Sequence, residues 1–204
     1  MEESSYRFVI LFTYVAASLV NNIPMNTFSS TATIVKNNFD LPPILISLNY
    51  LICPISHAIM AFPINWMLTK KGIRFSYYLG AAVMVAGVWL RTTLTEGNPY
   101  LCLLGSFMSG GSGLVIMNSA SKITLNWFRA DMLTVVTFIT VLTSLVSIAA
   151  GLFVPAFLVN AASNRDDFMA FLRFEAILIT VPFLLLVIFI REKPKIPPSK
   201  AAEV

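Results

Sequence analysis

The sequence predicts an all-α polytopic membrane protein, built as a bundle of six transmembrane helices. Of its 204 residues, 57% are hydrophobic and only 12% are charged, whereas soluble domains carry about 25% charged residues. The mean hydropathy is +0.78. Long apolar runs recur along the chain, and each approaches the ~20 residues that a helix needs to cross the hydrocarbon core. The links between them are short, which leaves no room for a separate soluble domain.

The chain divides into a short N-terminal segment, a membrane domain and a basic, proline-rich tail. We place these at 1–7, 8–190 and 191–204, with crossings over about 8–35, 44–68, 75–93, 100–125, 132–159 and 168–190. The first residues are acidic and too few for a cleavable signal peptide, and they lack the arginines of a transit peptide. They therefore leave the mitochondrial inner membrane and the plasma membrane both open.

The first crossing contains two adjacent amides, Asn21 and Asn22, followed by Pro24. Amides near mid-membrane are costly unless they face protein or a water-filled cavity. Two interpretations follow. Either they form interhelical hydrogen bonds that compensate a kink at Pro24, which we favour, or Asn21 contacts a ligand.

The second crossing contains His57, the single histidine of the chain. An intramembrane histidine either relays protons or is a neutral, hydrogen-bonded packing residue. Because the sequence shows no carboxylate facing it, we favour packing and keep a proton or partner-facing role as the alternative.

A basic turn after the second crossing predicts the topology. It contains Lys70, Lys71, Gly72 and Arg74. Loops rich in lysine and arginine are the hardest to translocate, so they remain on the cytoplasmic or matrix side. Together with both termini and the turn after the fourth crossing, this side carries ten such residues, against three on the other: Lys36, Arg91 and Arg165. Both termini are therefore expected on the cytoplasmic or matrix side.

Small residues dominate the fourth crossing. The pairs Ser106/Gly110 and Ser109/Gly113 are four apart and predict close contact between helix backbones. A phosphate-binding loop is excluded because no strand precedes the glycines and no Lys-Ser/Thr follows them. In the sixth crossing, Glu175 is the deepest acid, which makes it a candidate proton site or intersubunit ion-pair partner.

Several functions lack any supporting pattern. The sequence contains no nucleophile–base pair, carboxylate couple or metal-ligand cluster, so we expect no enzyme, no metal and no cofactor. Both cysteines fall inside apolar runs. The net charge of +4 reflects cations at helix ends, so nucleic acid is not an expected partner. The expected partners are the lipid bilayer and other membrane subunits or a second copy of the chain.

Short motifs spread over the whole chain carry a family resemblance. They include Ser18-Leu19-Val20-Asn21, Gly72-Ile73-Arg74, Gly87-Val88-Trp89-Leu90-Arg91, Trp127-Phe128 and Ile148-Ala149-Ala150-Gly151. In this order and spacing, the chain resembles the N-terminal half of a major facilitator superfamily transporter. Within that superfamily it is most similar to the branch of the feline leukaemia virus subgroup C receptors. The resemblance implies a half-transporter fold, with substrate bound between two six-helix halves.

The chain departs from the family pattern at several positions. Thr69 replaces an acid that the superfamily uses to latch its two halves together. In the choline-transporting receptors, a tryptophan of the third crossing and a glutamine of the fifth line the substrate site. Trp89 matches that tryptophan, whereas Leu145 replaces the glutamine. Pro24-Met25 stands where the receptors have Gln-Trp. The chain also stops where the family's central linker begins, which predicts that the second half is missing.

Two functional hypotheses follow from the resemblance. The first, which the departures favour, is a non-transporting accessory subunit of a larger membrane complex, for example a respiratory assembly. The alternative is a solute transporter completed by dimerisation or by a separate second half. Its substrate would be a small organic cation, bound by Asn21, Trp89 and Asn118, with Trp89 offering a cation–π face.

Overall fold

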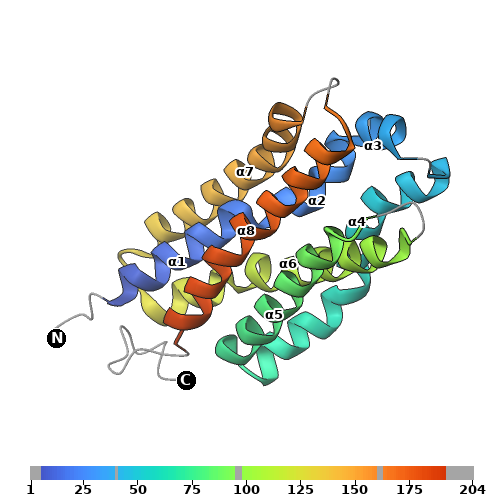
Figure 1. Ribbon diagram of the computed structural model, residues 1–204. Coiled ribbons are helices and arrows are strands. Elements are labelled where there is room, and N and C mark those ends of the chain that lie inside the picture. The colour runs from blue at the N-terminus through green and yellow to red at the C-terminus, as the bar shows by residue number, and fades with distance from the viewer. Residues whose placement is uncertain (1–5, 40, 95–97, 160–162, 192–204) are drawn as a thin grey trace.

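The computed structural model describes residues 6–39, 41–94, 98–159 and 163–191. Within these residues the chain forms eight helices and no strand (Figure 1). Six segments there are long and apolar enough to cross a membrane. The first is the joined α1–α2 segment, and the others are α4 (Pro43–Lys70), α5 (Ile73–Arg91), α6 (Tyr100–Trp127), α7 (Leu133–Leu158) and α8 (Arg165–Phe189). The predicted all-α bundle of six crossings is confirmed.

The first crossing is interrupted, where the sequence analysis expected one helix over 8–35. It consists of α1 (Tyr6–Asn21) and α2 (Ile23–Ser30), and α3 (Ala32–Asn38) follows. Pro24 lies in the first turn of α2 and has no amide proton to donate. The interruption is stabilised from α7, because the backbone N–H and the side-chain amide of Asn22 both donate to Ser147 Oγ, at 3.3 and 2.9 Å. Asn22 thus forms the interhelical hydrogen bonds that the packing interpretation predicted.

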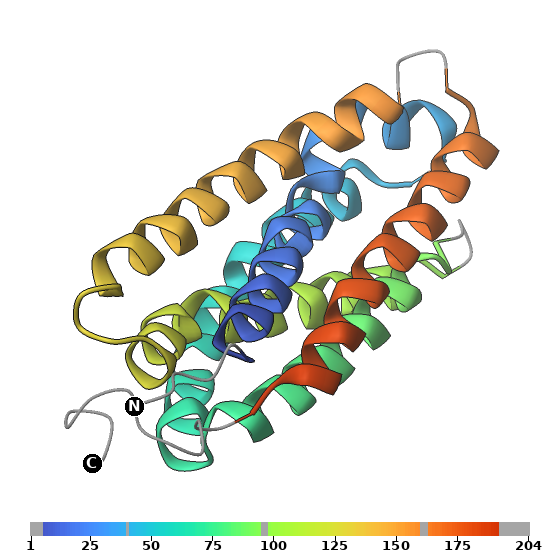
Figure 2. The same cartoon turned by 90° about the vertical axis from the view of Figure 1, so that its left-hand side faces the viewer.

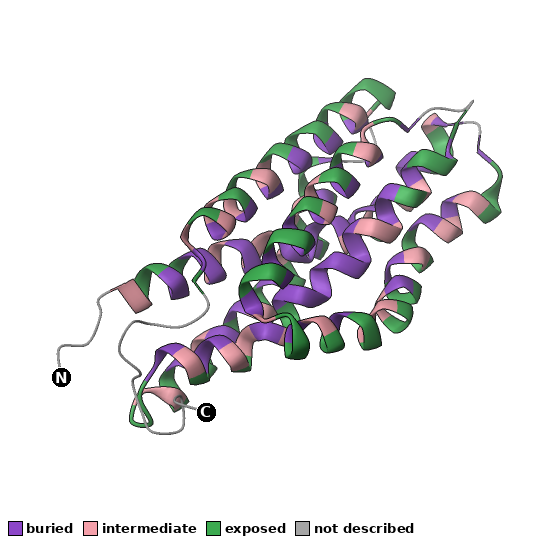
Figure 3. Cartoon of the chain, turned by 90° about the horizontal axis from the view of Figure 1, so that it is seen from below, coloured by how far each residue is buried: buried purple, intermediate pink, exposed green. Residues whose placement is uncertain are grey.

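Helix α6 lies at the centre of the bundle and packs against α5 and α4. Figure 3 shows how buried residues concentrate on the inner helices, while the outer helices expose one side. The approach of α5 is close, since a Cβ added to Gly105 would lie 2.5 Å from the Gly87 carbonyl oxygen. On the α4 side, a Cβ at Gly110 would lie 2.9 Å from Cys53 Cα. Gly110, a member of the predicted pairs, therefore makes the expected close backbone contact, whereas the contact of Gly105 with α5 was not predicted.

The basic turn between α4 and α5 requires glycine. Gly72 has φ = 86° and precedes the first residue of α5, a conformation that side chains with a Cβ rarely adopt. Lys70, Lys71 and Arg74 are all exposed around this turn.

Helices α7 and α8 flank α1, and α5 and α7 lie at opposite edges of the bundle (Figures 1 and 2). Helix α8 begins with a capping box, in which the Asn164 side chain and the Asp167 side chain each accept a hydrogen bond from the other residue's backbone N–H. Tyr6 donates to the Phe189 carbonyl oxygen at 2.6 Å. The start of α1 and the end of α8 therefore lie at the same end of the molecule.

Candidate functional site

A polar groove lies between α4, α6 and α7, with a volume of about 420 Å³. Asn65 contributes from α4. The other lining residues are Met117, Asn118, Ala120, Ser121 and Thr124 of α6 and Thr137, Thr140 and Val141 of α7. Because Asn65 precedes Lys70 by little more than one helical turn, the groove lies in the half of the bundle nearer the basic turn.

The groove is lined by amides and hydroxyls. Asn118 Nδ2 donates to Asn65 Oδ1 at 3.1 Å, so these two residues join α6 to α4 across the groove. Thr124 and Thr140 donate to carbonyl oxygens of their own helices, both at 2.9 Å, and their hydroxyl oxygens can still accept hydrogen bonds. Among the described residues, none that lines the groove is charged or aromatic. The groove can bind the hydroxyl or amino group of a small solute, but it supplies neither a counter-ion nor a cation–π face.

Helical spacing produces this polar lining. Asn118, Ser121 and Thr124 recur every three residues and fall on one side of α6. Thr137 and Thr140 repeat the same spacing on α7. A stripe of this kind is a signal in the sequence, although the sequence analysis singled out only Asn118 from it.

The structure does not bring the three predicted substrate residues together. Asn21 is buried, and its Nδ2 donates to the Gly113 carbonyl oxygen of α6 at 3.4 Å. Trp89 is 45% exposed and donates from Nε1 to Thr180 Oγ1 of α8 at 3.2 Å. Of the three residues, Asn118 is the one that lines the groove.

The distance along the bundle separates Trp89 from Asn118. Trp89 lies close to the level at which Gly87 packs on Gly105. At 1.5 Å per residue, Asn118 lies about 20 Å further along α6 than Gly105. One small solute cannot contact both residues at once in this arrangement.

Glu175 belongs to a buried ion pair within the chain. Its Oε1 accepts a hydrogen bond from Arg91 Nη1 at 2.5 Å, and the two side chains are 2% and 1% exposed. Thr27 donates to Glu175 Oε2 at 2.6 Å. The pair therefore connects α5 to α8, and Thr27 adds α2 to the contact.

The remaining guanidinium atoms of Arg91 are enclosed by the protein. Among the described residues, its Nε and Nη2 have no hydrogen-bond partner. The guanidinium carbon lies 5.0 Å from the centre of the Phe28 ring, so a cation–π contact adds to the stabilisation of this buried charge.

His57 lies apart from this pair. It is half-buried on α4, and its Nε2 has no hydrogen-bond partner within the described part of the chain. No hydrogen bond or ion pair joins it to Glu175 there. Among the described residues, no three His, Cys, Asp or Glu side chains gather as metal ligands would.

The Arg91–Glu175 pair was not predicted from the sequence. Because Arg91 ends the third apolar run, we counted it among the cations of the loop that follows. The sequence does contain a signal for this pair. One apolar helix carries a cation and another carries an anion, and intramembrane charges usually pair with one another.

Comparison with known proteins shows that the chain is similar to several transporters. It is 28% identical over 200 residues, 96% of its length, to the choline/ethanolamine transporter flvcr2b of Danio rerio. It is 24% identical over 219 residues, 98% of its length, to the choline/ethanolamine transporter FLVCR1 of Mus musculus. An uncharacterized MFS-type transporter of Caenorhabditis elegans, C09D4.1, is 24% identical over 96% of this chain. No protein-family model matches the chain.

The chain spans only part of these relatives, namely 41%, 39% and 34% of their respective lengths. All three are named as transporters, and none as an enzyme or as an accessory subunit. The comparisons therefore favour the transporter alternative over the accessory-subunit hypothesis. The chain is a multi-pass membrane protein of transporter type, similar to one half of a major facilitator fold and related to its FLVCR branch.

Proposed function

We propose that this chain forms one six-helix half of a major facilitator-type transporter for a small organic cation of the choline or ethanolamine class. The observation that carries the proposal is the polar groove, which combines an Asn65–Asn118 amide pair with threonine hydroxyls. The similarity of the chain to choline/ethanolamine transporters, over nearly its whole length, supports the proposed substrate class.

The groove provides half of a binding site. Choline and ethanolamine each carry a hydroxyl group, for which amides and hydroxyls are suitable partners. Each also carries a positive charge, and the lining of the groove contains no acid or aromatic ring. In this proposal a second six-helix unit, on the same or another polypeptide, supplies the aromatic or acidic partner for the cation.

A transport assay tests the proposal. The protein is expressed in cells, and uptake of radiolabelled choline and ethanolamine is compared with cells that lack it. We expect saturable uptake that each compound inhibits for the other. Asn118→Ala should reduce the uptake by up to about tenfold, on the order of one lost neutral hydrogen bond. Thr93→Ala changes an exposed residue just beyond the C-terminal end of α5; it is the control and should leave uptake unchanged.

The role of Trp89 is a separate proposal. If Trp89 binds the cation, as the family resemblance implies, Trp89→Ala abolishes uptake while Trp89→Phe retains part of it. If the groove alone holds the solute, both variants transport normally. If a native membrane that contains the protein at normal levels transports neither choline nor ethanolamine, the proposed substrate class is contradicted.

A further inference from the structure

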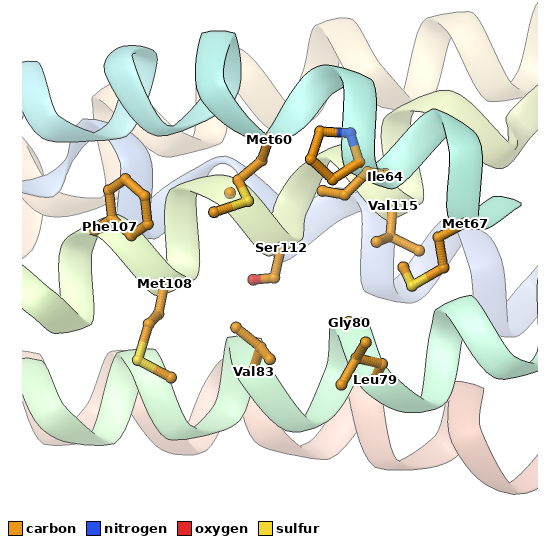
Figure 4. A pocket seen from close by; sticks show the side chains of 12 residues that line it. Met60, Ile64, Met67, Leu79, Gly80, Val83, Phe107, Met108, Ser112 and Val115 are labelled. Atoms are coloured by element: carbon orange, nitrogen blue, oxygen red, sulfur yellow. The ribbon is translucent and has the colours of Figure 1, made fainter.

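A second cavity lies on the opposite side of α6 from the polar groove. It has a volume of about 260 Å³ and lies between α4, α5 and α6 (Figure 4). Met60 and Met67 line it from α4, Val83 from α5, and Met108 and Val115 from α6. Figure 4 shows these side chains pointing into a common space from the three helices.

The side chains that line this pocket favour a hydrocarbon occupant over water. Within the described part of the chain, Ser112 is the one polar side chain in the lining, and its hydroxyl already donates to the Ser109 carbonyl oxygen at 3.2 Å. A buried water needs two to four polar partners, whereas an apolar cavity of about 150 Å³ remains dry and holds a benzene ring. All three helices are long and apolar enough to cross the membrane. The medium at the mouth of the pocket is therefore the lipid acyl region.

Cations lie beyond one end of the pocket. Lys70 and Lys71 follow Met67 by three and four residues, so they continue the face of α4 that lines it. Both are exposed. On α6, Lys122 follows Val115 by two helical turns, and its Nζ donates to the Leu68 carbonyl oxygen of α4 at 2.7 Å. The apolar lining of both helices thus leads to lysines at the same end.

We propose that this pocket binds an anionic glycerophospholipid. One acyl chain occupies the space between α4, α5 and α6, and the phosphate lies against Lys70, Lys71 and Lys122. Anionic lipids are concentrated in the cytoplasmic leaflet, the side that we propose for this turn. The lipid site is independent of the proposed transport function, because a different side of α6 lines the polar groove.

Lipid binding to the purified protein tests the preference for an anionic headgroup. The purified full-length chain is titrated with phosphatidylglycerol or with phosphatidylcholine of identical acyl chains, and native mass spectrometry measures the bound fraction. We expect phosphatidylglycerol to bind more tightly, and the double variant Lys70→Gln/Lys71→Gln to weaken it by roughly tenfold or more. Lys36→Gln, a change to an exposed lysine on α3, is the control and should not weaken it. Equal affinity for the two lipids would overturn the proposal.

The acyl position is tested separately. Val83→Trp fills the pocket and should abolish the preference for phosphatidylglycerol, whereas Ala82→Trp adds the same ring at an adjacent exposed position outside the lining and should preserve it. Phosphatidylglycerol with a photoreactive acyl chain provides a test on the unaltered protein. Cross-links to Met60, Met67 or Met108 are expected, and cross-links confined to α7 and α8 would refute the assignment.

Discussion

Arg91 and Glu175 are the two residues whose chemistry is most unusual for their surroundings. Both lie in apolar helices, and both are almost completely inaccessible. Removing ions from water costs more than their mutual attraction returns unless geometry and additional hydrogen bonds are favourable. Thr27 provides such support to Glu175 through a hydrogen bond, and the ring of Phe28 supports Arg91. The pair fixes how α5, α8 and α2 contact one another.

Removing one charge of this pair should destabilise the protein strongly. Glu175→Leu leaves the guanidinium of Arg91 buried without its counter-ion, at a cost of about 3–5 kcal/mol. The double variant Arg91→Met/Glu175→Leu removes both ions and should recover most of that loss. Thermal unfolding in detergent measures both. A double variant no more stable than Glu175→Leu would show that the pair itself stabilises the fold.

The contact between α5 and α6 is the feature that most constrains the helices. Gly105 meets the Gly87 carbonyl and also the Arg91 side chain, whose Cγ would lie 3.0 Å from an added Cβ. Backbone cannot move aside as a side chain can, so even one methyl group must separate the two helices. This contact also positions Arg91 beside α6.

Gly105→Ala and Gly111→Ala should therefore differ in stability. The added methyl at position 105 meets backbone at 2.5 Å, whereas at position 111 the nearest atom is Met60 Cγ, at 3.0 Å in a flexible side chain. We expect Gly105→Ala to lose about 1–3 kcal/mol and Gly111→Ala to lose less. The melting temperatures of the two variants in one detergent provide the comparison, and an equal loss would contradict the close backbone contact.

The existence of each membrane crossing could be predicted from the sequence, because six apolar runs of bilayer length are separated by short polar turns. The interruption of the first crossing was harder to predict. Pro24 and Asn22 indicated a kink, but the partner that makes the break stable, Ser147, lies on α7. Contacts of this kind depend on how the helices pack, which no local pattern encodes.

For the whole molecule, the sequence indicated the half-transporter fold, but it did not locate the polar groove. Asn118 lines the polar groove, but Asn65 and the threonines of α7 were not identified. Their roles depend on which helix faces are neighbours in the bundle. The Arg91–Glu175 pair was missed for the same reason, since its two residues are brought together only by the packing of α5 on α8.

The predicted orientation of the molecule rests on the uneven distribution of lysine and arginine along the chain. Burial of Arg91 strengthens the asymmetry, because this residue no longer counts as a loop cation. With both native cysteines buried, Lys71→Cys and Lys36→Cys each introduce one accessible thiol. In intact cells or organelles, a membrane-impermeant thiol reagent should label Lys36→Cys directly and Lys71→Cys only after permeabilisation. The opposite pattern would reverse the orientation.

We propose that the groove face meets a second six-helix unit, and cross-linking in the native membrane can capture that unit. Val141 lines the groove and is 53% exposed, so Val141→Cys places a reactive thiol on that face. After treatment with a short thiol-reactive photo-cross-linker, mass spectrometry identifies the attached peptide. We predict a peptide from a second six-helix transporter unit, either another region of the same polypeptide, a second copy or a separate chain. Attachment to subunits of an unrelated membrane complex would contradict the account and restore the accessory-subunit hypothesis.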